Sequence, residues 1–237
     1  MKTFLSLSPG KVASVALLGM TYSSFAHADA SLTLSEDAPS AWEPYDGAEI
    51  KFDVFRKGDK KFGSHVVAFD VADDGSFTAN TEVSLRAGLG PITVFRYTLE
   101  SQERWENNQL IGLEAATNDD GEKERVLVEM NGGSLAVDGS GYEGTAPAGI
   151  IPSSHWNIRE VFSSQILSTE SGELLDVEVT KIGEERLDVA GQAIDATHYR
   201  LVSDLTVDLW YDDQGRWVQL SFEARGQTID YRLAEIY

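Results

Sequence analysis

Residues 205–233 have the sequence LTVDLWYDDQGRWVQLSFEARGQTIDYRL. Three runs of alternating apolar and polar residues follow one another here, separated by Asp212-Asp213-Gln214-Gly215 and by Arg225-Gly226-Gln227. A period of two is typical of strands that bury one face. Glycine and aspartate tolerate the backbone conformations that tight hairpin turns require. The stretch therefore predicts three neighbouring antiparallel strands.

The same pattern extends over most of the chain. Ile50, Phe52 and Val54 alternate with charged residues, and residues 175–180 repeat the alternation. Similar turn sequences separate further runs: Lys57-Gly58-Asp59, Asp73-Asp74-Gly75, Asp119-Asp120-Gly121 and Asn131-Gly132-Gly133. Such short connections exclude the long crossovers that parallel strands need. We predict a mainly all-β fold, a strongly curved up-and-down antiparallel sheet of about eleven strands, forming a barrel or half-barrel.

One segment in the middle of the chain breaks the alternation. Residues 146–156 contain Pro147 and Pro152, which a regular central strand does not tolerate. Asn157 is a good helix N-cap, and Glu160 stands three residues later, as in a capping box. Apolar residues then follow at helical spacing. We expect one short helix, about residues 158–167, at an opening of the sheet.

The N-terminus has the pattern of a cleavable export signal. Lys2 and Lys11 precede a short apolar run, and Ala26-His27-Ala28 provides small residues where an export peptidase cuts. We predict cleavage between Ala28 and Asp29 and a periplasmic location, because the run is shorter than the ~20 residues of a membrane span. The predicted organisation is a signal peptide (1–28), an irregular tether (29–46) and a single antiparallel β domain (47–237).

Charge and cysteine content narrow the partners. The net charge is −20, and removal of residues 1–28, which hold two lysines and no acid, leaves about −22. Such acidity disfavours nucleic acid and direct membrane insertion. The chain has no cysteine, so burial and sheet pairing must supply the stability of an exported protein. We expect a small amphipathic ligand or an envelope component as partner; the oligomeric state is left open.

Motifs for catalysis and cofactors are weak. Residues 139–144 spell G-x-G-x-x-G, but Pro147 and antiparallel surroundings follow, so we interpret them as a hairpin loop. His65, His155 and His198 lack the close spacing of metal ligands. Ser153-Ser154-His155 lacks a nucleophile elbow and fits the entry to a helix better. We therefore predict no metal, no cofactor and no assigned catalytic residue.

Residues 92–105 form a strand with two different faces. Arg96 lies on a polar face, and Phe95 and Tyr97 lie on the opposite one. The simpler interpretation is a solvated face with cross-strand ion pairs. The alternative is a polar concavity in which Arg86 and Arg96 meet an anionic head group. The sequence is compatible with both interpretations.

Several of these features together resemble a known family. They are Glu103-Arg104-Trp105, Ser154-His155-Trp156-Asn157, Trp210-Tyr211-Asp212 with Gly215-Arg216-Trp217-Val218, and Ile229-Asp230-Tyr231-Arg232-Leu233. The pattern is similar to a family of uncharacterised exported proteins of Gram-negative bacteria, known as a domain of unknown function. More distantly, the architecture is similar to the periplasmic lipoprotein-carrier fold, whose concave apolar face holds acyl chains. Fold alone does not imply function.

The leading hypothesis is a non-catalytic periplasmic binding or carrier protein for an amphipathic or lipophilic ligand. The candidate ligand-binding residues are Arg86, Arg96, Tyr97, His155, Trp156, Arg200 and Trp210. One alternative is an envelope hydrolase that uses His155 as a base near Ser153 or Glu160. Another is a structural or interaction module, which predicts a large exposed apolar patch and no cavity.

Overall fold

The structure is a computed structural model that describes residues 41–89 and 92–237. The predicted signal peptide, its cleavage site and residues 29–40 of the predicted tether lie outside the described residues. Residues 41–46 have no helix or strand, yet Trp42 packs edge-on against Phe69 and Tyr237, at centroid distances of 5.3 and 4.9 Å. This segment is therefore attached to the sheet by aromatic contacts.

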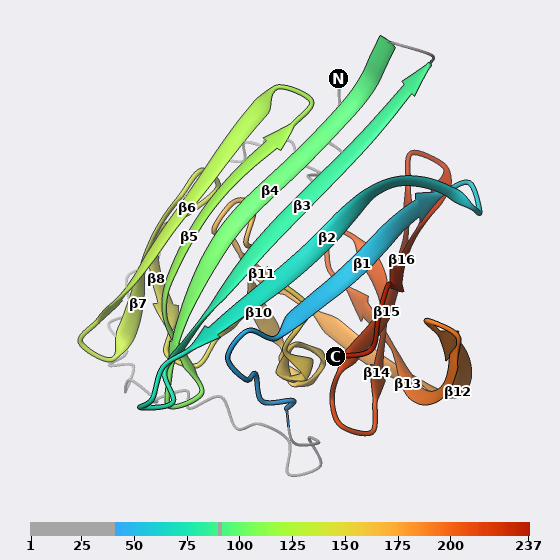
Figure 1. Cartoon of the computed structure of the whole chain (residues 1–237). Coiled ribbons are helices and arrows are strands. Elements are labelled where there is room, and N and C mark those ends of the chain that lie inside the picture. The colour runs from blue at the N-terminus through green and yellow to red at the C-terminus, as the bar shows by residue number, and fades with distance from the viewer. Residues whose placement is uncertain (1–40, 90–91) are drawn as a thin grey trace, which may run out of the picture.

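The described chain is almost entirely β-structure (Figure 1). Its strands are β1 (Glu49–Arg56), β2 (Lys60–Val71), β3 (Phe77–Leu89), β4 (Ile92–Glu106), β5 (Gln109–Asp119), β6 (Glu122–Asn131), β7 (Ser134–Gly139), β8 (Glu143–Pro147), β9 (Ile151–Pro152), β10 (Gln165–Leu167), β11 (Leu174–Asp176), β12 (Glu178–Val189), β13 (Gln192–Val202), β14 (Thr206–Asp212), β15 (Trp217–Ala224) and β16 (Gln227–Leu233). A 3₁₀ helix, η1 (Ile158–Phe162), is the one helical element in the described part.

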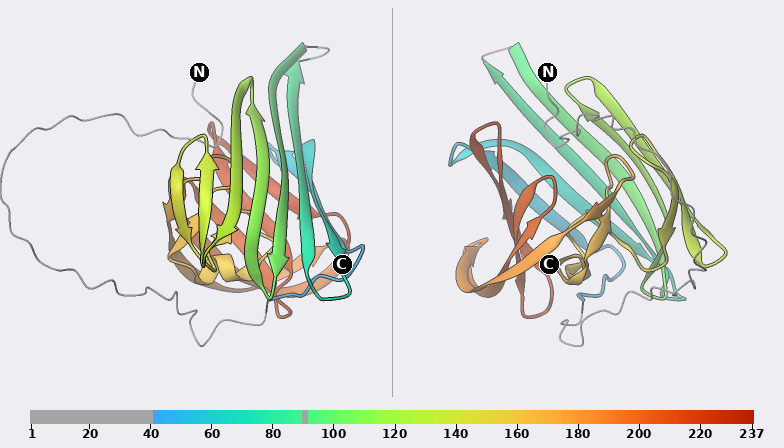
Figure 2. Two further views of the ribbon diagram at one scale, coloured as in Figure 1. Left: turned by 90° about the vertical axis from the view of Figure 1, so that its left-hand side faces the viewer. Right: turned by 180° about the vertical axis from the view of Figure 1, so that it is seen from behind.

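The main sheet has thirteen strands in the order β12-β13-β14-β15-β16-β1-β2-β3-β4-β5-β6-β7-β8, and all its neighbours are antiparallel. Two meanders, β1–β8 and β12–β16, are thus joined where β16 pairs with β1. Strands β12 and β8 form the two edges and are not neighbours, so the barrel is open. Figure 2 shows the curvature of the sheet. The predicted curved antiparallel sheet is confirmed, in its half-barrel form.

The strand count exceeds the predicted eleven for two reasons. Hairpins at Asn107-Asn108 and Ala190-Gly191 contain residues with positive φ that were not among the predicted turns. In addition, the segment that joins the two edges, residues 148–177, contains the short strands β9, β10 and β11. These form a second, three-stranded sheet in the order β11-β10-β9. We call residues 148–177 the crossing segment.

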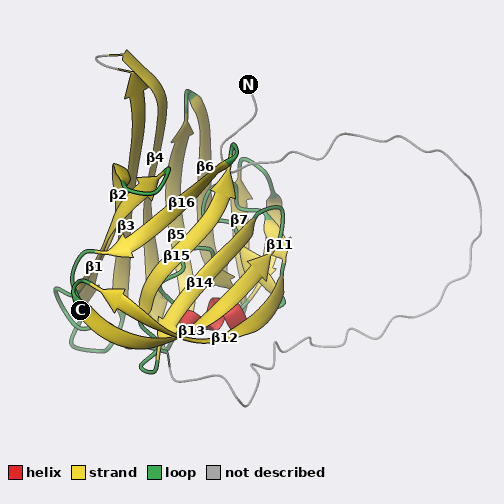
Figure 3. Cartoon of the chain, turned by 90° about the vertical axis from the view of Figure 1, so that its right-hand side faces the viewer, coloured by secondary structure: helices red, strands yellow, loops and turns green. Residues whose placement is uncertain are grey.

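The predicted helix begins where expected but is shorter. The Asn157 side chain accepts a hydrogen bond from the Arg159 N–H at 3.1 Å, as an N-cap does. The helix ends at Phe162, because the Ser163 N–H bonds to the Glu160 carbonyl and β10 then pairs with both β9 and β11. Figure 3 shows this helix inside the curve, behind β12 and β13. No helix among the described residues is long and apolar enough to cross a membrane.

The alternation of buried and exposed residues along β4 shows on which side of the sheet the core lies. Phe95, Tyr97 and Leu99 are buried, whereas Arg96 and Glu100, on the opposite face of the strand, are exposed. We call the buried side of the main sheet its inner face and the exposed side its outer face. Glu103 shares the inner face and is fully buried beside Trp105, whose indole N–H donates to it at 2.8 Å. This acidic side chain is therefore built into the core.

Candidate functional site

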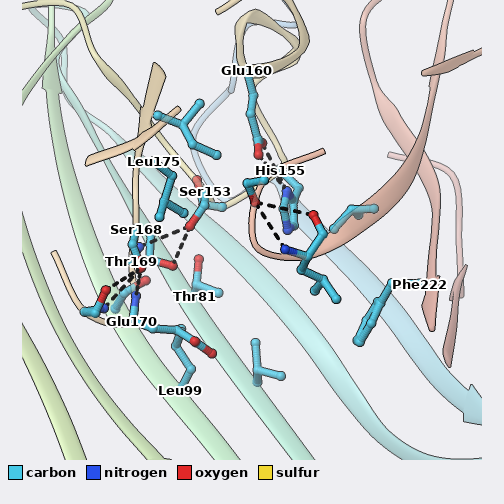
Figure 4. Close-up of a pocket in the computed structure, with 18 of the residues that line it drawn as sticks. Thr81, Leu99, Ser153, His155, Glu160, Ser168, Thr169, Glu170, Leu175 and Phe222 are labelled. Atoms are coloured by element: carbon cyan, nitrogen blue, oxygen red, sulfur yellow. Dashed lines mark hydrogen bonds and ion pairs between the residues drawn. The ribbon is translucent and has the colours of Figure 1, made fainter. Parts of the chain in front are cut away.

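A pocket lies between the inner face of the main sheet and the crossing segment. Its cavity volume is 190 Å³, and both meanders contribute to its lining. At about 30 Å³ per water, this equals roughly six water volumes. Figure 4 shows that its lining side chains come from the strands on one side and from the crossing segment on the other. The pocket therefore fits a small molecule or the end of a larger one.

The strands supply most of the apolar lining of the pocket, together with polar side chains such as Thr81 and Ser101. Leu99 comes from β4, Leu201 from β13, and Leu220 and Phe222 from β15. The crossing segment supplies the polar wall, with Ser153, His155, Glu160, Ser168 and Glu170 among its residues. Apolar surface, mainly on the strand side, and hydrogen-bonding groups on both sides make the cavity amphipathic.

Besides Ser154 Oγ, three buried polar atoms in the lining have no hydrogen-bond partner in the described part of the chain. They are His65 Nε2, Thr81 Oγ1 and Ser101 Oγ, on side chains that are 5, 5 and 8 % exposed. Thr81 and Ser101 face each other across β3 and β4. A buried polar group without a partner costs about 1–3 kcal/mol. The hydroxyls therefore offer hydrogen bonds to whatever occupies the pocket.

His65 is held neutral by its surroundings. Its ring contacts Trp217 and Tyr231 at centroid distances of 5.2 and 5.7 Å. Burial, and then the nearby His155, lower the pKa of His65 to about 3. The imidazole therefore provides hydrogen-bonding capacity at neutral pH without charge.

His155 is fixed by contacts at both ends. Its φ is +65°, a left-handed conformation that non-glycine residues adopt rarely, and its carbonyl accepts a hydrogen bond from the Tyr211 hydroxyl at 2.7 Å. Its Nδ1 lies 3.0 Å and 3.1 Å from the two carboxylate oxygens of Glu160, which is fully buried. Glu160 therefore does not close the predicted capping box; it orients the imidazole at the pocket.

Glu170 carries the most perturbed carboxylate in the pocket. It accepts a short hydrogen bond from the Tyr97 hydroxyl. Burial raises the pKa of Glu170 to about 7; the Tyr97 hydrogen bond opposes this rise, and the charges of Glu124 and Asp119 add to it. Figure 4 shows the Glu170 side chain extending between Thr81 and Leu99. This carboxylate therefore changes charge near neutral pH.

The loop that carries Glu170 lies against the hairpin of β7 and β8. The Gly141 N–H donates to the Ser171 carbonyl at 2.8 Å. A Cβ on Gly139 would lie 2.3 Å from the same carbonyl oxygen, so the close approach requires glycine. The Ser168 hydroxyl accepts from the Glu170 and Ser171 N–H groups at 3.3 and 3.2 Å. Glycines that spell a nucleotide motif thus let the loop pack closely.

The lining of the pocket is rich in acidic side chains. It contains five carboxylates and neither lysine nor arginine: Glu124, Glu160, Glu170, Glu173 and Asp204. Of its histidines, His65 is neutral and His155 is paired with Glu160. Within residues 41–89 and 92–237, no group of three or more His, Cys, Asp or Glu is arranged to hold a metal ion. The pocket is acidic, and its polar groups suit an organic ligand.

The structure brings two of the seven candidate residues to the pocket, Tyr97 and His155. Trp156 is buried next to it, where its indole N–H donates to Glu103 at 3.1 Å and its ring meets Trp105 edge-on. Its role there is core packing. Sequence alternation identified the buried face of β4 correctly, and this is why Tyr97 was found.

The three arginines are not in the pocket. Arg86 and Arg96 are exposed and lie directly opposite each other on β3 and β4. Arg200 is exposed on β13 and pairs with Asp208 at 2.9 Å. Residues next to inward-facing Tyr97 and Leu201 point to the other face of the sheet, so these guanidinium groups cannot meet a head group inside. The solvated-face interpretation holds for this surface.

Trp210 also lies on the outer face. Its ring stacks on His198 at 4.1 Å, and its indole N–H donates to Glu185 at 3.2 Å. Both nitrogens of His198 have carboxylate partners, Glu185 and Asp208, each at 2.9 Å. This is a closed structural cluster, because every polar atom of the two rings has a partner.

Sequence reasoning missed the polar wall of the pocket. Glu170, Ser168, Thr81 and Ser101 were not singled out, and the signal for them is weak. Small polar residues in Ser168-Thr169-Glu170-Ser171-Gly172 indicate a turn-rich loop, but not the side of the sheet on which it lies. The site arises from tertiary packing of this loop against β7.

Fold and site together define a β-barrel-like protein, an open curved antiparallel sheet whose concave side is occupied by its own crossing segment. The model of the family "Domain of unknown function (DUF6134)" matches residues 52–234, and the chain belongs to this family. A solved structure with a similar fold is the "Beta-barrel-like Protein of Domain of Unknown Function DUF1849 from Brucella abortus", with a TM-score of 0.57, 11% identity, and coverage of 80% of this chain and 97% of that one. A comparison with curated proteins finds no match.

Proposed function

We propose that this protein is a non-catalytic binding or carrier protein that holds a small amphipathic ligand in the interior pocket. The observation that carries the proposal is the amphipathic lining, in which apolar strand residues and the polar side chains of the crossing segment share one cavity with two buried hydroxyls that lack partners, those of Thr81 and Ser101. Ligand-binding sites combine a mostly apolar wall with a few placed polar groups in this way. An exported, periplasmic carrier is the version of this function that fits the sequence.

The surface gives less support to an interaction module. The large apolar side chains exposed in the described part are Tyr45, Val94, Leu127, Ile182 and Val202. They belong to five different segments: the stretch before β1, and strands β4, β6, β12 and β13. Single exposed apolar residues are normal on a protein surface and do not form a docking patch.

The experiment is native mass spectrometry of the protein purified from its own cells, with extraction of what accompanies it. The variant Ser101→Leu places a larger apolar side chain in the cavity, and Gln102→Leu, one residue along β4 on the exposed face, is its control. A bound small molecule in the native protein and in Gln102→Leu, but not in folded Ser101→Leu, is expected. An adduct that persists in Ser101→Leu would place the ligand elsewhere and overturn the proposal.

A second candidate function is hydrolysis with His155 as a general base. The specific observation is the contact between Nδ1 and the buried Glu160 carboxylate, which leaves Nε2 for a substrate or water. Ser153, the nearest predicted nucleophile, is engaged with Thr169 instead, since its hydroxyl accepts from the Thr169 N–H at 3.1 Å. Turnover of p-nitrophenyl butyrate that disappears in His155→Ala would favour the enzyme; equal rates in both proteins would exclude this role for His155.

A further inference from the structure

We infer that the polar end of the ligand is a protonated amine, which pairs with Glu170 and with the hydroxyls of Thr81 and Ser101. This inference rests on the proposed function, because it names the chemical class of the molecule in the same pocket. Its basis is the geometry of the lining, in which an open carboxylate and unpartnered hydroxyls share one small cavity.

The sign of the charge follows from the lining. Five carboxylates and no lysine or arginine line the cavity, so an anionic head group meets repulsion without a compensating cation. The chain as a whole carries −20, which attracts cations and repels anions. A carboxylate taken out of water is costly unless a cation or several donors compensate it. Among the described residues, the Tyr97 hydroxyl is the side-chain donor to Glu170.

The hydroxyls point to a primary ammonium group. Such a group has three N–H donors and no acceptor. Thr81 Oγ1 and Ser101 Oγ are buried acceptors without partners, and they face each other across β3 and β4. Together with the Glu170 carboxylate they provide three acceptors, one for each N–H donor of the ammonium group. The remaining wall, with Leu99, Leu201 and Phe222 among its residues, suits a short hydrocarbon part.

The neighbours of Glu170 also predict how binding depends on pH. They are Tyr97 on β4, Asp119 on β5, Glu124 on β6, Tyr231 on β16 and Glu173 in the crossing segment. None of these is a cation. With its pKa raised to about 7, Glu170 gains its charge between pH 6 and pH 8. An alkylammonium keeps its charge there, because its pKa is near that of lysine, about 10.4. Amine binding should therefore tighten as the pH rises.

Isothermal titration calorimetry with three probes of equal chain length tests the inference: n-hexylamine, n-hexanol and hexanoate, at pH 6 and pH 8 and constant ionic strength. For the native protein at pH 8, hexylamine should bind about tenfold more tightly than hexanol, as expected for a charge-assisted hydrogen bond. Hexanoate should bind weakest. Hexylamine affinity should rise several-fold from pH 6 to pH 8, and hexanol affinity should stay constant.

Glu170→Gln and Glu100→Gln are the matched variants. Glu100 is exposed on the outer face of β4, the strand that carries Tyr97. Glu170→Gln should weaken hexylamine about tenfold and leave hexanol within about twofold, whereas Glu100→Gln should change neither. Equal hexylamine affinity in Glu170→Gln and in the native protein would overturn the inference. Tighter binding of hexanol or hexanoate than of hexylamine to the native protein would also overturn the inference, but the proposed function of the pocket would stand. If none of the probes binds, the proposed function itself fails.

Discussion

The two faces of the main sheet carry opposite charge chemistry. On the outer face, arginines pair with carboxylates in water: Arg104 with Glu129 at 2.7 Å, and Arg125 with Asp138 at 2.9 Å. Exposed pairs of this kind contribute about 0–1 kcal/mol each. In the interior, between the inner face and the crossing segment, neutral donors hold two carboxylates: indoles bind Glu103 and a tyrosine binds Glu170. Neutral donors do not cancel the negative charge of a carboxylate, so the pocket can still attract a cation.

The interior of the molecule contains two kinds of carboxylate. Glu103 is fully buried and receives two indole N–H groups, from Trp105 and Trp156. Glu170 receives a side-chain hydrogen bond from Tyr97 and lines the cavity. Burial raises the pKa of both carboxyl groups. The first therefore holds the core together, and the second is available to a ligand.

The largest effect is expected at Glu103. In Glu103→Leu, two buried indole N–H groups lose their acceptor, at a cost of about 1–3 kcal/mol each, so the free energy of unfolding should fall by about 4 kcal/mol. Urea denaturation measures this change. Glu103→Gln keeps an acceptor oxygen and should lose less. The exposed neighbour Glu100→Leu should stay within about 0.5 kcal/mol. A loss below about 1 kcal/mol in Glu103→Leu would contradict the structural role of this carboxylate.

The contrast between the two faces also explains how far the sequence could predict the molecule. Alternation in β1, β4, β15 and β16 gave the buried faces, and Gly and Asp turns gave most hairpins, because both are local properties. The pocket is not local. Glu170 reaches Tyr97 across 73 positions in the chain, through a loop that packs on Gly139. Alternation assigns each residue of a strand to one face of the sheet. It could therefore place Arg96 and Tyr97 on opposite faces, but it could not show which residues contact a ligand.

The second prediction concerns the pH dependence of stability. The folded protein holds the Glu170 proton up to a pKa of about 7, whereas the unfolded chain releases it near 4.5. The folded state therefore binds more protons between these values, and its stability falls as the pH rises from 4.5 to 7. Glu170→Gln removes this dependence. At pH 8 the variant should be more stable than the native protein by about 2–3 kcal/mol, and at pH 4.5 nearly equal.

Only the difference between the two proteins tests this prediction. His65 acts in the opposite direction, since its folded pKa of about 3 makes the native state lose stability as the pH falls below 6.5. This contribution is common to both proteins and cancels in the difference. Thermal or urea unfolding in parallel from pH 4.5 to pH 8 measures it. A constant difference across this range would mean that Glu170 is solvated in the folded protein.

The third prediction concerns the loop that carries Glu170. A Cβ in Gly139→Ala would lie 2.3 Å from the Ser171 carbonyl oxygen, so the loop must shift. We expect a loss of about 2 kcal/mol in the free energy of unfolding, in the range found for overpacking. Gly183→Ala is the control, because nothing lies within 4 Å of the corresponding Cβ in β12. If the two variants were equally stable, the loop would not depend on close packing against β7.

The smallest effect is expected at Arg96. Arg96→Gln changes an exposed side chain that lies directly opposite Arg86, and removal of one of two facing like charges should shift stability by less than about 0.5 kcal/mol. Hexylamine affinity should stay within about twofold, because Arg96 and Tyr97 point to opposite faces of β4. The neighbouring variant Tyr97→Phe removes the hydroxyl that holds Glu170 and should alter hexylamine affinity. If Arg96→Gln instead weakened binding tenfold while Tyr97→Phe had no effect, the ligand would lie on the outer face. The acidic pocket would then be an unfilled part of the core.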